Sequence, residues 1–287
     1  MINANSIKKR LKNIAVKQNK QFDYLLMLYM VERFLYRISV SDYSDLFILK
    51  GGLLLYTILE DKGRVTKDID FLALNKNNSQ DEIVKVFNDL CMIECDDALI
   101  FDSESIGAQI IREGAAYEGI RVKLTAYLDN SRKVLQFDIS FGDVVVPHPV
   151  VLEYPVLLDM ARPKLKVYSL ESIIAEKFEA MIYLADINSR MKDFYDIYYI
   201  LGKFNISNAR LYQAIKETFK RRKTPMMETP VVLSGDHKFI DNKQIQWNAF
   251  LKRIQSEMDV EFSDIIERII EILGPIYKKI YDENHID

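Results

Sequence analysis

The chain is poor in the residues that many catalytic and metal sites use. It has two cysteines and three histidines among 287 residues. The histidines stand far from one another and from both cysteines, which argues against a histidine-based metal site and a Cys–His nucleophile pair. Cys91 and Cys95 lack the second pair that a structural zinc site needs, and we interpret them as buried, reduced thiols on one face of a helix. Any catalysis must then rest on carboxylates and lysines.

Long apolar segments are also missing. No stretch reaches the about 18 uninterrupted apolar residues that indicate a membrane helix, and the basic N-terminal residues precede no apolar signal segment. We therefore expect a cytoplasmic protein without a membrane partner. The net charge of −3 excludes coating of nucleic acid by bulk charge. Two basic runs, KKRLK at 8–12 and KRRK at 220–223, are either solvated helix faces or local contacts to nucleic acid.

Apolar residues are abundant enough, at 49%, for a sizeable core. Helical periodicity runs from Ile7 to about Val40, short apolar runs and turns fill Leu46 to about Leu158, and a helical pattern returns after Ser169. We predict an α+β fold, a small mixed sheet flanked by helices, followed by a mainly helical C-terminal region. The expected domains are a helical lead-in packed on the core (1–45), an α+β core (46–165) and a helical domain (166–287).

Individual elements can be placed within these regions. RVKLTAYL and VLQFDISFG alternate apolar and polar residues around the polar DNSRK, which predicts two strands joined by a turn. Helices are expected at 80–90, directly after Ser169, and at 191–203, 207–220, 241–256 and 261–281.

Residues 47–71, FILKGGLLLYTILEDKGRVTKDIDF, join a short strand to a helix through two glycines. Gly51 and Gly52 at such a junction would let backbone N–H groups approach a ligand, and the N-terminus of the helix favours an anion. When the glycine pair is taken alone, a tight turn is the more common explanation. The pair therefore indicates a phosphate site only in combination with other features.

Three carboxylates provide the additional features that the glycine pair needs to indicate a phosphate site. If KDIDF is a strand, Asp68 and Asp70 point to one face while Ile69 and Phe71 point to the other. Two carboxylates on one strand face repel each other unless a cation lies between them. The same alternation in VLQFDISFG makes Asp138 a third carboxylate from a neighbouring strand. Together these residues predict a site for a divalent metal and a triphosphate rather than three exposed strand carboxylates.

The later helices carry a further charged group. Lys177 lies on the helix that follows Ser169, where its ammonium could neutralise a triphosphate as a point charge. Asp193 and Asp196 are three residues apart and share a helix face. A functional contact and a buried ion pair tying two helices together are both open for these aspartates.

The run KGGLLLYTILEDKGRVTKDIDF resembles the first motif of the AbiEii/AbiGii-type nucleotidyltransferases, with its Lys-Gly-Gly, short helix, Arg-x-Thr/Ser and Asp-x-Asp. The resemblance extends to FDISFGD, SLESIIAEKFEAMIYL and RMKDFYDIYYIL, and covers most of residues 46–203 in the expected order. This family is similar in its core to the DNA polymerase β-like nucleotidyltransferases. Many of its members are toxins of toxin–antitoxin or abortive-infection systems.

The resemblance implies roles for the matching residues. Those implied in nucleotide binding are Lys50, Gly51, Gly52, Arg64, Thr66 and Lys177. Those implied as Mg²⁺ ligands are Asp68, Asp70 and Asp138, and the implied catalytic set adds Lys177 and Asp193. Leu53 departs from the pattern, because the family often has Thr or Ser there. Without this hydroxyl, phosphate binding must rely more on backbone N–H groups and on lysine.

The implied reaction is transfer of a nucleoside monophosphate from a nucleoside triphosphate (NTP) to an acceptor hydroxyl, with release of pyrophosphate and Mg²⁺ as cofactor. The resemblance makes the 3′ end of a tRNA the leading acceptor and a cognate antitoxin a partner. Alternatives are a protein or small-molecule acceptor, or a non-catalytic scaffold of the same fold that binds RNA or a partner. Three intact, mutually repelling carboxylates argue against the scaffold, which has no use for them.

Overall fold

The structure is a computed structural model that describes residues 3–60, 63, 66–74, 79–113 and 117–285. The chain divides into two compact units. The first unit comprises Met1–Thr57, Thr66–Gly142 and Val150–Val167, and the second comprises Ile58–Val65, Asp143–Pro149 and Tyr168–Asp287. The chain passes into the second unit for the last time after Val167.

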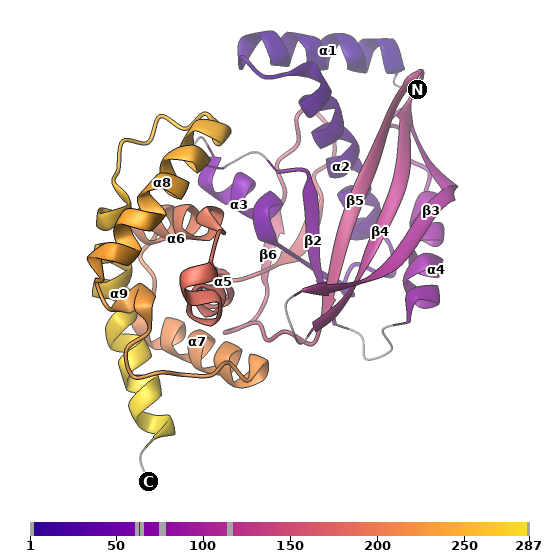
Figure 1. The fold of residues 1–287 in the computed structure, drawn as a ribbon. Coiled ribbons are helices and arrows are strands. Elements are labelled where there is room, and N and C mark those ends of the chain that lie inside the picture. Colours follow the sequence, from indigo (N-terminus) through magenta and orange to yellow (C-terminus); the bar gives the residue numbers. More distant parts are fainter. Residues whose placement is uncertain (1–2, 61–62, 64–65, 75–78, 114–116, 286–287) are drawn as a thin grey trace. The chain divides into compact units, whose positions relative to one another are not determined.

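A mixed sheet organises the first unit (Figure 1). Its seven described strands follow the order β3-β4-β5-β2-β1-β7-β6. Strand β2 pairs antiparallel with β1 and parallel with β5, and β1 pairs parallel with β7. The strands are β1 (Phe47–Lys50), β2 (Asp68–Ala73), β3 (Leu99–Glu113), β4 (Tyr117–Leu128), β5 (Ser131–Phe141), β6 (Val150–Glu153) and β7 (Lys164–Val167). The predicted α+β fold with a mixed sheet is confirmed.

Helices α1 (Ala4–Lys17) and α2 (Phe22–Val40) lead into this sheet, and α3 (Gly51–Leu59) and α4 (Gln80–Cys91) follow its first two strands. The helical pattern expected from Ile7 to about Val40 is present as two helices, with a break between α1 and α2. The segment KQNKQ offers no apolar side chain to bury, and Asn19 adopts a left-handed conformation with φ of 50°. Asparagine tolerates that conformation better than most residues, so the helix ends there.

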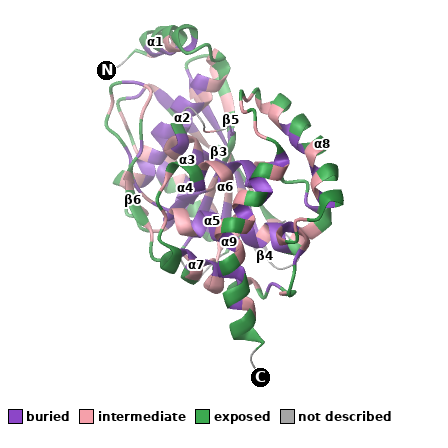
Figure 2. Ribbon diagram, turned by 90° about the vertical axis from the view of Figure 1, so that its left-hand side faces the viewer, coloured by how far each residue is buried: buried purple, intermediate pink, exposed green. Residues whose placement is uncertain are grey.

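Aromatic side chains fill the core between the sheet and the helices α2 and α4. Helix α2 is buried along most of its length (Figure 2). The ring centroid of Phe137 on β5 lies 5.0 Å from that of Phe87 on α4 and 6.5 Å from that of Phe71 on β2. Successive strand residues face opposite ways. Burial of Phe71 and Phe137 therefore places Asp70 and Asp138 on the other face of the sheet.

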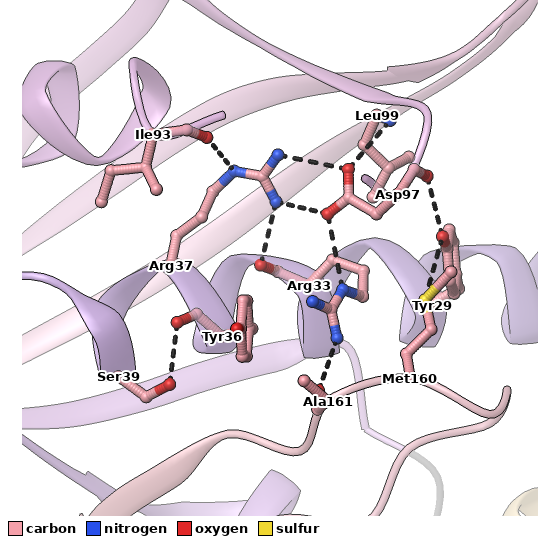
Figure 3. Close-up of polar contacts among 10 residues, drawn as sticks. All are labelled: Tyr29, Arg33, Tyr36, Arg37, Ser39, Ile93, Asp97, Leu99, Met160 and Ala161. Carbon is pink, nitrogen blue, oxygen red and sulfur yellow. Dashed lines mark hydrogen bonds and ion pairs between the residues drawn. The ribbon is translucent and has the colours of Figure 1, made fainter. Parts of the chain in front are cut away.

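A buried ion pair fastens α2 to the segment before β3 (Figure 3). The Nη1 atom of Arg37 lies 2.6 Å from Oδ2 of Asp97, and Nε of Arg33 lies 3.4 Å from the same oxygen. The backbone N–H of Leu99 donates to Asp97 Oδ1, and the Tyr29 hydroxyl donates to the Asp97 carbonyl. Two cations and an N–H group thus compensate a carboxylate that is withdrawn from water.

The second unit is mainly helical in its described residues. Its long helices are α5 (Leu170–Leu184), α6 (Met191–Lys203), α7 (Asn208–Arg222), α8 (His237–Ile254) and α9 (Phe262–Asn284). The helices expected in this region are therefore confirmed. The predicted cap is confirmed as well, because Ser169 Oγ accepts a hydrogen bond from the Ser172 N–H at 3.1 Å. No helix in the described part of the chain combines the length and apolar character needed to cross a membrane.

Candidate active site

A row of charged residues crosses the sheet of the first unit on the face opposite the phenylalanine core. Lys50 on β1 pairs in register with Asp70 on β2, Asp70 pairs with Asp138 on β5, and Asp138 pairs with Arg121 on β4. Directly paired residues share a face of the sheet. We call these four residues the charged row: two adjacent carboxylates with a cation on each flank.

Gly51 allows the start of α3 to approach the charged row. It follows Lys50 directly and has φ of +67°, a conformation that side chains with a Cβ rarely adopt. A Cβ at this position would lie 1.9 Å from Oδ2 of Asp70. The expected strand–glycine–helix junction is confirmed, and contact between Gly51 or Gly52 and a phosphate stays a prediction.

Asp68 lies at the start of β2 and is exposed. It is two residues before Asp70, so the strand points both carboxylates the same way, as predicted. Its N–H lies 3.3 Å from Oγ1 of the buried Thr66, and Gln136 on β5 donates to its Oδ1 at 3.4 Å. Thr66 and Gln136 therefore orient Asp68. Arg64, a predicted nucleotide ligand, lies outside the described residues.

Arg121 holds Asp138 through both carboxylate oxygens. Its Nε donates to Oδ1 and its Nη2 donates to Oδ2, each at 2.7 Å. The sequence interpretation missed this residue, although a signal was present. Leu128 pairs with Ser131 across the two-residue turn, and counting back along both strands places Arg121 opposite Asp138.

The donors Asp68, Asp70 and Asp138 fit a hard divalent cation by their chemistry, because Mg²⁺ prefers carboxylate oxygens. In the described part of the chain, however, no three Asp, Glu, His or Cys side chains are gathered as a metal-binding group. Asp138 directs its oxygens at Arg121 instead. Joint binding of a cation by all three carboxylates requires a different arrangement at Asp138, and their role as ligands stays a prediction.

Lys177 on α5 bridges two aspartates of α6 in the second unit. Its Nζ lies 2.7 Å from Oδ1 of Asp193 and 2.8 Å from Oδ2 of Asp196, and Arg190 Nε donates to Asp193 Oδ2. Burial acts to raise the pKa of Asp193, but Lys177 and Arg190 outweigh it and hold the pKa below its ordinary value. The ion pair tying two helices is confirmed for Asp196. A catalytic role for Lys177 and Asp193 stays a prediction.

The basic run at 220–223 does not form a fully exposed patch. Arg222 Nη1 lies 2.8 Å from Oε2 of Glu179, and Nη2 lies 3.4 Å from both Asp143 Oδ1 and Glu176 Oε1. Its charge is thus committed to three acids of its own unit. These contacts favour a structural role for Arg222, and contact of the run with nucleic acid stays a prediction.

The cysteines differ from the prediction in two respects, because they do not share a helix and they are half-buried rather than buried. Cys91 is the last residue of α4, whereas Cys95 lies beyond it, so the two do not share a helix face. Both are free and half-buried. Burial raises the pKa of the Cys91 thiol to about 12, which makes it a poor nucleophile at neutral pH.

Two solved structures from Helicobacter pylori have a similar fold. The crystal structure of JHP933 matches with a TM-score of 0.51 and 13% identity, covering 91% of this chain and 95% of that one. A candidate nucleotidyltransferase from H. pylori matches with a TM-score of 0.50 and 14% identity, covering 91% and 97%. At these identities the similarity concerns the fold alone. None of the curated proteins compared with the chain matches it.

A family model gives the assignment that the structures alone do not. The model described as "Nucleotidyl transferase AbiEii toxin, Type IV TA system" matches residues 33–268. This span is most of the chain and includes the charged row, Asp68 and the Lys177–Asp193 ion pair. The chain therefore belongs to the AbiEii family of nucleotidyltransferase toxins of type IV toxin–antitoxin systems.

Proposed function

We propose that the chain transfers a nucleoside monophosphate from an NTP to an acceptor hydroxyl in a Mg²⁺-dependent reaction, and that the acceptor is the 3′ end of a tRNA. One observation carries the proposal: Asp70 and Asp138 lie side by side on the sheet, and Asp70 is in contact range of Gly51 at the start of α3. A helix N-terminus attracts anions, and paired carboxylates attract the cations that accompany a triphosphate.

In this proposal the start of α3 binds the triphosphate. The first N–H groups of a helix have no partner within the helix and point towards a ligand beyond its end. Gly51 and Gly52 keep that end accessible, and Lys50 adds a positive charge next to it. Leu53 is buried and contributes no hydroxyl. Among the described residues of the first unit, the remaining proposed nucleotide-binding residue is Thr66, which orients Asp68.

The reaction joins the acceptor oxygen to the α-phosphorus. The bond between the α-phosphorus and the bridging oxygen breaks, and pyrophosphate leaves with the electron pair. Mg²⁺ held by Asp68, Asp70 and Asp138 would lower the pKa of the acceptor hydroxyl and neutralise charge on the leaving group. Asp138 accepts the proton of the acceptor. A catalytic role is also proposed for Lys177, whose ammonium is held by Asp193.

Helix α1 supports a nucleic acid as the acceptor. Residues 1–22 contain no Asp or Glu, although the chain as a whole is negatively charged. The exposed cations of this segment are Lys9, Arg10, Lys12, Lys17 and Lys20. A local excess of positive charge of this kind suits a phosphate backbone. Membership of a toxin–antitoxin family further implies a cognate antitoxin as a partner.

The proposal is tested by incubating the purified protein with Mg²⁺, total tRNA and each common NTP labelled at the α-phosphate. We expect label in tRNA, with one pyrophosphate released per nucleotide, and no label without Mg²⁺ or with Asp70→Asn. Label on a protein or a small molecule instead of tRNA would show that the acceptor belongs to that class. No transfer from any NTP, or equal transfer by Asp70→Asn, would overturn the proposed reaction.

A further inference from the structure

The contact between Arg121 and Asp138 has the geometry of a strong ion pair. Both hydrogen bonds measure 2.7 Å, and both oxygens of the carboxylate are engaged. The two residues are also direct cross-strand neighbours, so the sheet holds their backbones at a fixed separation. Such bidentate pairs are stronger than single-point contacts between a lysine and a carboxylate.

This ion pair changes what Asp138 offers to a cation. A carboxylate already neutralised by a guanidinium attracts a second positive charge less than a free carboxylate does. A divalent cation at Asp138 would also lie next to the guanidinium and repel it. Arg121 is about one-third exposed, with a side-chain exposure of 32% against 15% for Asp138, and its long stem allows it to move.

We propose that Arg121 competes with a divalent cation for Asp138. Once the cation is bound, the guanidinium of Arg121 leaves Asp138 and forms hydrogen bonds with a phosphate of the nucleotide. The planar fork that fits a carboxylate fits a phosphate equally well. Arg121 therefore holds Asp138 before the cation binds and contacts the substrate afterwards. The inference rests on the proposed function, because it assigns the cation and the triphosphate to this site.

Lys123 provides a matched control on the same strand. It lies two residues from Arg121, so it shares the same face, and it pairs in register with Gln136 rather than with a carboxylate. It is exposed and carries the same charge. Lys123→Gln therefore removes one positive charge from this face without touching Asp138.

The first measurement uses Mn²⁺ alone, titrated without nucleotide and followed by the paramagnetic signal of the free ion. We expect Arg121→Gln to bind Mn²⁺ about tenfold more tightly than the parent, since an opposing charge leaves the site. Lys123→Gln should stay within about twofold of the parent, as expected for a charge in water. In an Asp138→Asn background, Arg121→Gln should produce no further gain. Equal or weaker Mn²⁺ binding by Arg121→Gln, or an equal gain in Lys123→Gln, would overturn the competition.

The second measurement follows a non-hydrolysable NTP analogue at saturating Mn²⁺. Arg121→Gln should bind the analogue more weakly than the parent does, although it binds the metal more tightly. Equal affinity of the parent and Arg121→Gln for the analogue would overturn the proposed contact between Arg121 and a phosphate. Arg121→Lys keeps the charge but loses the fork, and should fall between parent and Arg121→Gln in both assays. Should Arg121→Gln not fold, Arg121→Lys decides: parent-like values in both assays would overturn the proposal. If the proposed function is wrong instead, the parent shows no nucleotide transfer although these differences in binding are observed.

Discussion

Gly51 and Asp70 approach each other so closely that residue 51 has no space for a side chain. A Cβ on Gly51 would lie 1.9 Å from Oδ2 of Asp70 and 2.8 Å from its Cβ. The carboxylate can rotate away, but the Cβ moves only if β2 moves. Pairing of β2 with β1 and β5 resists that movement. The backbone at the start of α3 thus sets the position of a predicted metal ligand.

Gly51→Ala should therefore impair both stability and transfer. We expect a loss of about 2 kcal/mol in unfolding free energy from left-handed strain and the clash. Displacement of Asp70 should reduce nucleotide transfer about 100-fold. Gly235→Ala is the matched control, because Gly235 has φ of +68° and no described atom lies within 4 Å of the place that a Cβ would take. It should cost about 1 kcal/mol and leave transfer intact. Equal transfer by Gly51→Ala and parent would show that Asp70 tolerates displacement.

The carboxylates should differ in what they contribute to stability. Asp68→Asn and Asp138→Asn should both abolish transfer if the carboxylates act as proposed. Asp138→Asn should also lower the unfolding free energy by about 1 kcal/mol, because it leaves the partly buried Arg121 without its counter-charge. Asp68 is exposed, so its variant should unfold like the parent. Urea titrations beside transfer assays check both statements, and retained transfer in either variant would remove that residue from the catalytic set.

Alternation along single strands was sufficient to predict which face of the sheet carries Asp70 and Asp138. The pattern of KDIDF fixes Asp70 on one face once Phe71 is buried, and the same holds for Asp138 beside Phe137. These predictions rely only on neighbours in sequence. They required no knowledge of which strands pair.

Contacts between distant segments were not predictable in the same way. The pairing of Lys50 with Asp70 depends on how the chain returns after α3, and no local pattern sets that register. Asp97 meets Arg37 across 60 positions, and an acidic residue in a loop gives no sign of burial. Arg121 was different, because the two-residue turn after Leu128 fixes its partner.

The Lys177 ion pairs make stability and catalysis hard to separate with a single variant. Lys177→Met should destabilise the protein by about 3 kcal/mol or more, since it leaves two fully buried aspartates without this cation. Adding Asp193→Asn and Asp196→Asn removes the uncompensated charges and should restore most of the stability. Transfer by the folded triple variant is then the readout. Absence of transfer supports a role for this charged group in the reaction, and parent-like transfer would make the group purely structural.

Glu32 on α2 should make stability fall as pH rises. It is buried and accepts a hydrogen bond from Leu157 N–H at 2.9 Å, and its Oε1 has no partner in the described structure. Burial raises the pKa of Glu32 to about 8, with Leu157 and Arg33 opposing the rise in part. Between its ordinary pKa of 4.5 and about 8, the folded protein keeps a proton that the unfolded chain releases.

Glu32→Gln should abolish this loss, because the amide cannot ionise. The advantage of the variant over the parent in unfolding free energy should therefore grow by about 3 kcal/mol from pH 5 to pH 8. Glu267→Gln, at an exposed position of α9, is the control and should show no comparable change. Urea unfolding at the two pH values measures the difference. A gain that is the same at both pH values would mean that Glu32 is ionised in the folded protein across this range.

The acceptor is tested through the exposed cations of α1, since Arg222 in the other basic run is committed to acidic partners. The triple variant Lys9→Gln, Lys12→Gln and Lys17→Gln should bind total tRNA more weakly than the parent. Each lysine that binds a phosphate releases a counterion, so the slope of log affinity against log salt should become shallower by about one unit for each such lysine replaced.

A second triple variant, Lys85→Gln, Lys238→Gln and Lys252→Gln, removes the same charge from exposed positions elsewhere. It should match the parent in affinity and salt slope, because bulk charge alone adds little at physiological ionic strength. Anisotropy titrations with labelled tRNA, without NTP, keep this measurement separate from the chemistry. If both triple variants bind tRNA equally weakly, the effect of the α1 lysines is one of net charge and not of a specific contact. An unchanged slope in the α1 variant would remove this helix from the tRNA-binding surface and favour a protein or small-molecule acceptor.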